Sequence, residues 1–270
     1  MIDLRRLRVG IEVDGGTVYY SSDDGMSISV QGRKTSTPTE NECHVMVINP
    51  NKSTRDSVLT SAGLQQPKVL TVEFGRQSTG LSQLFVGDIV NAELLPPPDM
   101  ALVMQANTSA GARYTITSHS PGISVPLSTI AARVASDMGL TLSMQAKDRD
   151  IRNWYHNGPA AVQVARIDAL GDVRAYVDDR TLIVQDKDKA RTGQIKILNQ
   201  STGMIDIPKL SDGGLTVSYL ADGVTEIGSM LRVESKLHPA ANGDWVILQL
   251  GFVLSSYEDE YTYTAECERI

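Results

Sequence analysis

The most constraining feature of the chain is the order of elements that the sequence predicts before residue 91. In order, they are a strand at residues 43–48, a turn at Asn49-Pro50, a helix at residues 51–59, and strands at residues 69–74 and 84–90. Asn51 is a favoured helix N-cap, and the Asn-Pro pair ends the preceding strand. β-branched and aromatic residues mark the strands on either side. This order favours a β module that carries a single short helix.

Alternating apolar residues extend the β pattern back to the N-terminus. One face of the first predicted strand carries Leu7, Val9, Ile11 and Val13, with the two-residue period of a half-buried strand. Gly and Pro interrupt strands and indicate turns, here at Asp14-Gly15-Gly16, Asp23-Asp24-Gly25 and Pro96-Pro97-Pro98. We therefore expect residues 1–108 to form one β-barrel or β-sandwich module.

The pattern changes to helices between residues 109 and 190. Helical spacing of apolar residues predicts two helices. The first spans residues 126–138 with a stripe of Leu127, Ile130, Ala131, Val134 and Met138, and the second starts at Asn157-Gly158-Pro159 with Ala160, Val164, Ile167 and Leu170. Asp178-Asp179-Arg180-Thr181 lies between two strand-like runs and indicates a hairpin. We expect a small α+β insert with about four strands, in which each helix packs on the insert's own sheet.

A second β pattern fills residues 191–270. Its clearest strands are residues 245–254 and 261–267, and a turn-forming cluster at residues 239–244 precedes them. A stretch of this length with several short strands suits a second barrel or sandwich. The predicted fold class is therefore mainly β, within the α+β group: two tube-like β-barrel or β-sandwich modules with a small α+β insert between them. The two β modules share no obvious sequence.

Length and charge argue against several classes of function. A chain of 270 residues holds two or three modules. The formal net charge of −7 argues against sequence-independent nucleic-acid binding, which needs Lys and Arg to neutralise phosphates. No apolar run approaches the ~20 residues of a membrane helix, and the N-terminus has no apolar core of a signal peptide. We therefore expect synthesis in the cytoplasm and no membrane association.

The sequence predicts no catalytic, metal-binding or cofactor-binding residues. Its histidines are His44, His119, His156 and His238, and none has the spacing of a metal motif. The cysteines, Cys43 and Cys267, lie far apart and are expected to be reduced thiols in strand cores. Cys43 and His44 are adjacent in a strand, so they point to opposite faces. Nucleophile-elbow and phosphate-loop motifs do not occur.

Some clusters leave a binding site open as an alternative. Trp154-Tyr155-His156 has the composition of a ligand platform, although a packing or contact loop before the second helix is the favoured interpretation. Asp23-Asp24 and Asp178-Asp179 are interpreted as turn acids, because Asp favours turns. Glu258-Asp259-Glu260 lacks the spacing of a calcium loop and is expected to be a solvated or lumen-facing loop.

Four stretches carry a family resemblance. They are residues 45–75, the strand Phe85-Val86-Gly87-Asp88-Ile89, the strand Leu182-Ile183-Val184, and the ending formed by Leu231-Arg232-Val233, Gly243-Asp244, residues 245–254, Glu258-Asp259-Glu260 and residues 261–268. Taken in order along the chain, they resemble the phage tail baseplate hub proteins, a family related to late control protein D and to the hubs of type VI secretion spikes. The resemblance covers the whole chain as a pattern of elements.

The resemblance implies a structural role in a virion. In such hubs three copies form a ring, and two barrels per copy match a six-fold tail tube above and a three-fold spike below. The implied partners are further copies of the chain, the tail tube protein, a spike or tail-tip protein, other baseplate proteins and a tape-measure protein. An acidic lumen lets DNA pass without holding it, and we expect Asp23, Asp24, Glu258, Asp259 and Glu260 to line it.

Two other classes of function compete with the hub. A phage-associated cell-wall hydrolase needs paired carboxylates, and the dense acids of the insert are Asp168, Asp172, Asp178 and Asp179. A carbohydrate-binding or adhesion module needs exposed aromatic residues, and the chain has two Trp, three Phe and nine Tyr. The hub is the favoured interpretation, with no enzymatic activity and no specific nucleic-acid binding.

Overall fold

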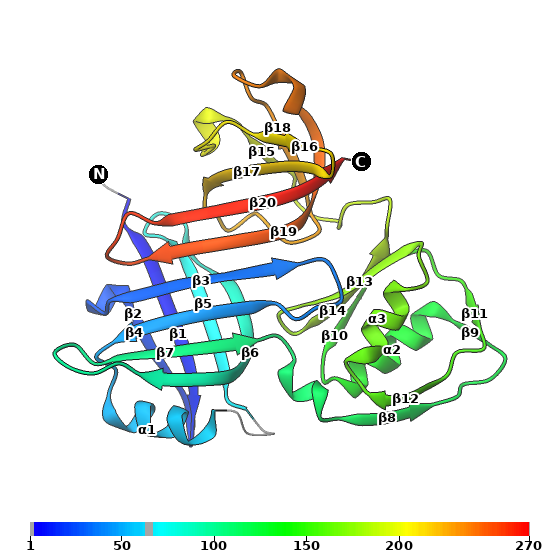
Figure 1. Ribbon diagram of the computed structural model, residues 1–270, viewed down its shortest axis with the longest axis horizontal. Coiled ribbons are helices and arrows are strands. Elements are labelled where there is room, and N and C mark those ends of the chain that lie inside the picture. The colour runs from blue at the N-terminus through cyan, green and yellow to red at the C-terminus, as the bar shows by residue number, and fades with distance from the viewer. Residues whose placement is uncertain (1–2, 63–66, 270) are drawn as a thin grey trace.

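The computed structural model describes residues 3–62 and 67–269. Figure 1 shows two β modules, one above the other, with an α+β insert beside them. The predicted mainly β, α+β class is confirmed. Among the described residues, no helix has the length and apolar character needed to cross a membrane.

The described residues of the first module form seven strands and one α-helix. Its elements are β1 (Arg5–Val13), β2 (Gly16–Ser21), the 3-10 helix η1 (Ser22–Asp24), β3 (Ile28–Thr35), β4 (Glu42–Ile48), α1 (Lys52–Ser61), β5 (Val69–Arg76), β6 (Gly80–Leu94) and β7 (Ala101–Asn107). The expected inward face of β1 is confirmed, because Leu7, Val9 and Ile11 are fully buried. Asn51 caps α1 as predicted, since its side chain accepts a hydrogen bond from the Thr54 N–H.

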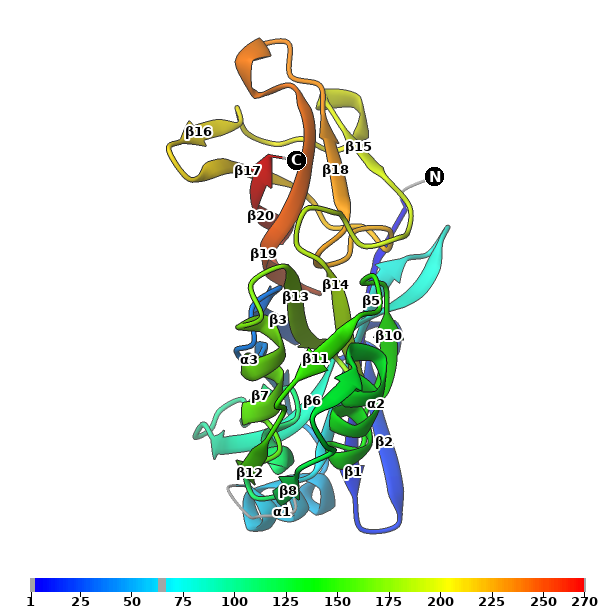
Figure 2. The same ribbon diagram turned by 90° about the vertical axis from the view of Figure 1, so that its right-hand side faces the viewer.

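The second module is smaller and ends in the long hairpin that the sequence predicts. Its elements are β15 (Lys196–Leu198), η3 (Gln200–Thr202), β16 (Lys209–Ser211), β17 (Gly214–Leu220), β18 (Met230–Val233), η4 (Pro239–Ala241), β19 (Gly243–Ser255) and β20 (Tyr261–Arg269). In Figure 2 the β16–β17 hairpin projects from the upper part of the molecule.

The two modules share one continuous sheet. The first half of β19 pairs with β18 and its second half pairs antiparallel with β3, while β20 covers the other edge. The sheet therefore runs in the order β16-β17-β20-β19-β3-β4-β7-β6-β5-β1-β2. A single apolar core includes residues of both modules, from Leu7 to Cys267. The boundary between the modules stays a prediction, but a strand pairing and a shared core cross it.

The two modules are also topological repeats of each other. Strands β3 to β7 have the spatial order β5-β6-β7-β4-β3, and strands β16 to β20 have the matching order β18-β19-β20-β17-β16. A bulge follows Ile89 in β6, and a bulge follows Ile247 in β19. Ile89 faces Ala106 of β7, just as Ile247 faces Cys267 of β20. This repeat lies in the strand registers, which explains why sequence comparison of the two halves does not show it.

The insert has three small sheets around two α-helices. Its elements are η2 (Ala110–Arg113), β8 (Ile116–His119), β9 (Ser124–Pro126), α2 (Leu127–Asp137), β10 (Thr141–Met144), β11 (Asp150–Arg152), β12 (His156–Pro159), α3 (Val162–Asp168), β13 (Val173–Asp178) and β14 (Thr181–Asp186). Sheets β10-β14-β13, β11-β9 and β12-β8 supply seven strands, more than the four expected.

Both insert helices bury the predicted faces in a core of the insert's own residues. Ile130 of α2 and Ile167 of α3 pack with Ala175 and Leu182 of the central sheet. The predicted start of the second helix is wrong, however. Residues 157–159 belong to β12, which pairs with β8, so this pairing replaces the helical turn and α3 begins at Val162.

We predict that Ile130→Asp or Ile167→Asp destabilises the insert by about 3 kcal/mol or more, because each places an unpaired charge in a closed core. Ile123→Asp is the matched control, since Ile123 is 82% exposed. The two tryptophans separate the modules: Trp154 lies in the insert core, and Trp245 lies in the core shared by the β modules. In a Trp→Phe background the remaining tryptophan reports urea unfolding of its own core. The aspartate substitutions should lower the unfolding midpoint reported by Trp154 and leave the midpoint reported by Trp245 unchanged. A common shift at both tryptophans would contradict an independent insert.

Candidate functional site

The structure does not gather the histidines and cysteines into a reactive site. His44 is half-exposed and bonds Glu42 across 2.8 Å, whereas Cys43 beside it is fully buried, so the opposite-face prediction is confirmed. Cys267 is buried and free like Cys43, and burial raises the pKa of its thiol to about 12. Within residues 3–62 and 67–269, no group of His, Cys, Asp and Glu side chains has the arrangement of a metal site.

The remaining histidines serve local packing and hydrogen bonding. His119 lies 2.5 Å from a carboxylate oxygen of Asp137, His156 is buried near the Gly158 carbonyl, and His238 bonds the Pro208 carbonyl at 2.7 Å. His119 and His156 face each other across the β8–β12 pairing of the insert, whereas His238 lies in the second β module.

The Trp154-Tyr155-His156 cluster divides between the core and the surface. Trp154 is buried in the insert, and the Arg166 guanidinium stacks over its ring at 5.1 Å. Tyr155 remains 53% exposed, while His156 begins β12. A flat ligand platform needs aromatic faces turned to solvent together. The cluster instead anchors the connection between β11 and β12, which agrees with the packing interpretation.

The acids required by the hydrolase alternative are held apart by separate partners. Asp168 accepts a hydrogen bond from the Ala175 N–H at 3.0 Å, and Asp172 pairs with Arg149. Asp178 and Asp179 bind Lys34 of β3. The loop acids Asp23, Asp24 and residues 258–260 are exposed, and Asp23 pairs with Arg6.

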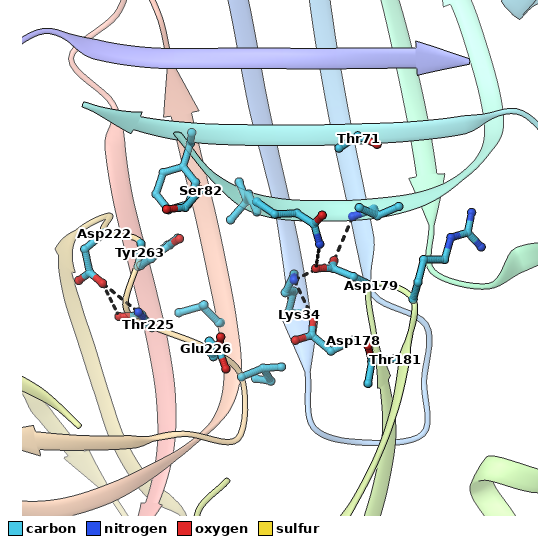
Figure 3. A pocket seen from close by; sticks show the side chains of 18 of the residues that line it. Lys34, Thr71, Ser82, Asp178, Asp179, Thr181, Asp222, Thr225, Glu226 and Tyr263 are labelled. Atoms are coloured by element: carbon cyan, nitrogen blue, oxygen red, sulfur yellow. Dashed lines mark hydrogen bonds and ion pairs between the residues drawn. The ribbon is translucent and has the colours of Figure 1, made fainter. Parts of the chain in front are cut away.

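A polar cavity lies where the insert meets both β modules. It has a volume of about 660 Å³. Its walls come from β5, β6, β19, β20, the β13–β14 hairpin and the loop before β18, as Figure 3 shows for Thr71, Ser82, Asp179, Glu226 and Tyr263. Segments from all three parts of the chain therefore meet at this cavity, which we call the junction.

A buried lysine occupies one wall of the junction. The Lys34 ammonium lies 2.7 Å from an Asp178 oxygen and 2.9 Å from an Asp179 oxygen (Figure 3). Lys34 is 7% exposed. Burial alone would lower the pKa of Lys34, but the two carboxylates outweigh burial and raise it. The ammonium therefore stays charged at neutral pH, as a buried cation must when it is paired.

Further bonds extend this anchor across the insert. Asp179 also accepts hydrogen bonds from the Val86 N–H and from the Gln83 amide, at 3.0 and 2.9 Å. Arg180 pairs with Asp88 of β6 at 2.6 Å, and Arg174 pairs with Glu268 of β20. The hairpin therefore binds strands of both β modules.

The chemistry of the junction is structural. Its cations Lys34, Arg180 and Arg191 each lie beside an acid, and Arg191 contacts both Asp178 and Glu226. The described side chains therefore leave no unpaired cation to hold an anionic substrate there. The sequence held a signal for this anchor that the prediction missed. Lys34 continues the inward alternation of Ile28 and Val30, so a charged residue falls on a core face and needs buried partners.

The solvent-facing side of the continuous sheet is polar but sparsely charged. Side chains on this side of the sheet include Gln31, Arg33, Glu42, His44, Gln105, Gln249, Thr264, Glu266, Thr216 and Ser218. Several are held by one another, since Gln105 donates to Glu42 at 2.7 Å and Gln249 donates to Glu266 at 3.0 Å. This side is a broad surface of amides, hydroxyls and a few acids.

Comparison with known proteins assigns the chain to a family. The family model described as "Baseplate hub gp41" matches residues 6–267. The chain belongs to this baseplate hub family. The predicted resemblance to phage tail hub proteins is therefore confirmed, and the protein is a structural component of a phage tail. No curated protein sequence matches the chain.

Solved structures of other tail proteins share the fold of this hub protein. A tail protein from Neisseria meningitidis MC58 superposes with a TM-score of 0.66 at 10% identity, covering 97% of this chain and 96% of that one. The 43 kDa tail protein of prophage MuSo2 from Shewanella oneidensis gives a TM-score of 0.64 at 9% identity, covering 97% and 98%. The E. coli c3393 protein, a component of the type VI secretion system, gives 0.62 at 10% identity, covering 90% and 73%.

We predict that Lys34→Met destabilises the hub protein by about 3–5 kcal/mol, because it leaves two carboxylates buried without their ammonium. Lys52→Met is the control: Lys52 makes an exposed pair with Asp56, and its loss should cost under about 0.5 kcal/mol. Urea midpoints measure both effects. Restoring part of the loss with Asp178→Asn and Asp179→Asn in the Lys34→Met background would identify the buried charge as the cause, and no recovery would contradict it.

The pH dependence of this anchor has a defined sign. The folded-state pKa of Lys34 is raised above the unfolded value, so its contribution is complete at neutral pH. The contribution declines only as the pH rises beyond the ordinary lysine pKa of ~10.4.

Proposed function

We propose that the protein is a non-enzymatic hub whose copies close into a ring of three, with pseudo-six-fold symmetry, between the tail tube and the central spike. Family membership supports the structural role. The observation that carries the ring is the internal repeat, because each chain supplies two equivalent β modules joined edge to edge in one sheet. Three such chains present six modules in a closed cycle. The ring would then join partners with six-fold and three-fold symmetry.

The proposed ring surrounds the channel through which DNA leaves the virion. We place the polar side of the continuous sheet toward this channel, since the opposite side of the sheet packs into the core. Glu42 and Glu266 on that side, and the loop acids near residues 23 and 258, make a wall that repels phosphate. The small number of cations on this side, Arg33 among them, supports passage without binding.

The proposed partners follow from this position. They are the tail tube protein, a spike or tail-tip protein, other baseplate proteins and a tape-measure protein, with assembly into the virion after synthesis in the host cytoplasm. A chain in the structure of a Francisella PdpA-VgrG complex shares the fold with a TM-score of 0.60 at 10% identity, and this chain covers 53% of that longer chain. In that structure a protein of this fold is part of a larger complex, which supports contact of this chain with further components.

The first test of the ring is its copy number. We predict three copies of the chain at the tail tip, because two modules per copy then give six. Cryo-electron microscopy of the assembled particle measures this directly, and native mass spectrometry of a complex with the spike protein checks it independently. Two, four or six copies in the particle would rule out the proposed symmetry.

The second test addresses the channel. We predict that Glu42→Lys with Glu266→Lys makes assembled hub retain duplex DNA at moderate salt, since added cations gain affinity by releasing counterions from phosphate. Asp150→Lys with Asp188→Lys is the control, because it reverses the same number of exposed acids on the insert. Filter binding at several salt concentrations measures the effect. Tight DNA binding by the unmodified hub would contradict a passive channel.

A further inference from the structure

Each chain contains one complete joint between modules and the two halves of a second joint. In the complete joint, β3 pairs antiparallel with the second half of β19. The internal repeat makes β16 the counterpart of β3, and β6 the counterpart of β19. The halves of the second joint are therefore β16 and the end of β6 that follows its bulge.

Among the described residues, neither half of the second joint is paired with a strand along its outer edge. β16 is the last strand of the sheet and pairs with β17 alone. The pairing of β5 with β6 ends at Val69 and Asp88, and only the Lys68 carbonyl reaches further, to the Ile89 N–H. Beyond that point β6 pairs with β7 on its other edge up to Leu94. Among the described residues, no strand covers the second edge of residues 91–94.

We propose that β16 of one copy pairs antiparallel with the end of β6 in the next copy, in the register that the β3–β19 joint displays. This inference rests on the proposed ring and names the surfaces that close it. Within a single chain, β16 ends the sheet on one side, and six strands, β19 and β3 among them, lie between it and the end of β6. Such a head-to-tail contact is heterologous, so it closes into a ring when the rotation between copies fits. A second copy is therefore the occupant that this pair of edges selects.

The internal repeat fixes the register of the proposed joint. Gly32 of β3 and Leu210 of β16 occupy equivalent positions. Starting from Ile89, the successive partners across the sheet are Ala106, Cys43 and Gly32. Starting from Ile247, they are Cys267, Leu215 and Leu210. Phe252 and Leu94 are counterparts, because each lies five residues after the matched isoleucine. Phe252 faces Gly32 in the complete joint. Leu94 should therefore face Leu210 of the neighbouring copy.

The side chains at these positions are complementary. In the complete joint a Cβ on Gly32 would lie 2.5 Å from the Phe252 ring, so the large Phe252 side chain lies opposite a residue that has no side chain. In the proposed joint two leucines share that space. Leu210 is 41% exposed in the single chain and Leu95, next to Leu94, is 39% exposed. Burying both against a second copy removes apolar surface from water.

Charge complementarity supports the same register. Glu93 should face Ser211, and Leu95 should face Lys209, so Glu93 and Lys209 become diagonal neighbours on one face of the sheet. Both are exposed in the single chain. In the described part of the chain, neither forms an ion pair.

Disulfide trapping tests the register. In the full-length protein, Leu94→Cys with Leu210→Cys should give covalent species of two and three chains on oxidation, and so should Glu93→Cys with Ser211→Cys. Two adjacent pairs are used because directly opposed residues alternate between two geometries in an antiparallel ladder. The control, Leu94→Cys with Ser211→Cys, slips by one residue, places the thiols on opposite faces and should trap far less. Cys43 and Cys267 are buried and do not compete.

The outcomes separate the joint from the ring. Trapping by the matched pairs but not by the slipped pair supports the joint. Oligomers seen by native mass spectrometry, with no trapping or equal trapping by all three pairs, would overturn the joint and leave the ring standing. Neither oligomers nor trapping, including in the presence of the spike protein, would overturn both.

A charge exchange provides a second readout that does not depend on oxidation. Glu93→Lys or Lys209→Glu should weaken assembly roughly two- to five-fold at each joint, and the two changes together should restore it. Lys236→Glu is the matched control, because Lys236 is also exposed in the same module. Sedimentation velocity measures assembly. Failure of the double variant to recover would overturn the proposed register.

Discussion

The arrangement of this hub protein depends on the burial of one ammonium group. Lys34 lies in β3, the strand whose outer edge joins the second module, and its side chain binds the Asp178–Asp179 hairpin of the insert. A buried cation is tolerated only when carboxylates accompany it. The pairing therefore fixes where the hairpin lies, and the hairpin in turn pairs with β6 through Arg180 and is joined to β20 through Arg174. One ionic contact thus orients three parts of the chain.

The long strands β6 and β19 give the modules their common plan. Each changes its neighbour part-way along, and in each a bulge stands at that point. An extra residue bends a strand and increases its twist, so one strand can pair first with β5 or β18 and then, past the bulge, turn that edge away from them. In β19 the second half is covered by β3, whereas the same half of β6 is open. In the proposed ring, this difference between equivalent strands distinguishes the joint inside the chain from the joint between chains.

The sequence predicted the local features well and the distant ones poorly. Strand β1, the capped helix α1 and the hairpin at Asp178 follow from alternation, capping and turn residues that lie close together. The predicted helix start at Asn157 failed because β8, nearly forty residues earlier, recruits that segment into a strand. The Lys34 anchor and the β3–β19 joint were missed for a similar reason. Each depends on a partner far along the chain, and no local propensity records which partner a strand edge or a buried charge will meet.

The joint between β3 and β19 also orders events during synthesis. Ser36 donates a hydrogen bond to the Leu248 carbonyl, although these residues are 212 positions apart. Contacts of such separation form late, and a chain still on the ribosome lacks them. Until β19 emerges, β3 exposes an unpaired edge and Lys34 lacks the strand beside it. A truncated chain would keep that edge open and offer it to aggregation. Pairing of the C-terminal hairpin with β3 is therefore the contact that closes this edge.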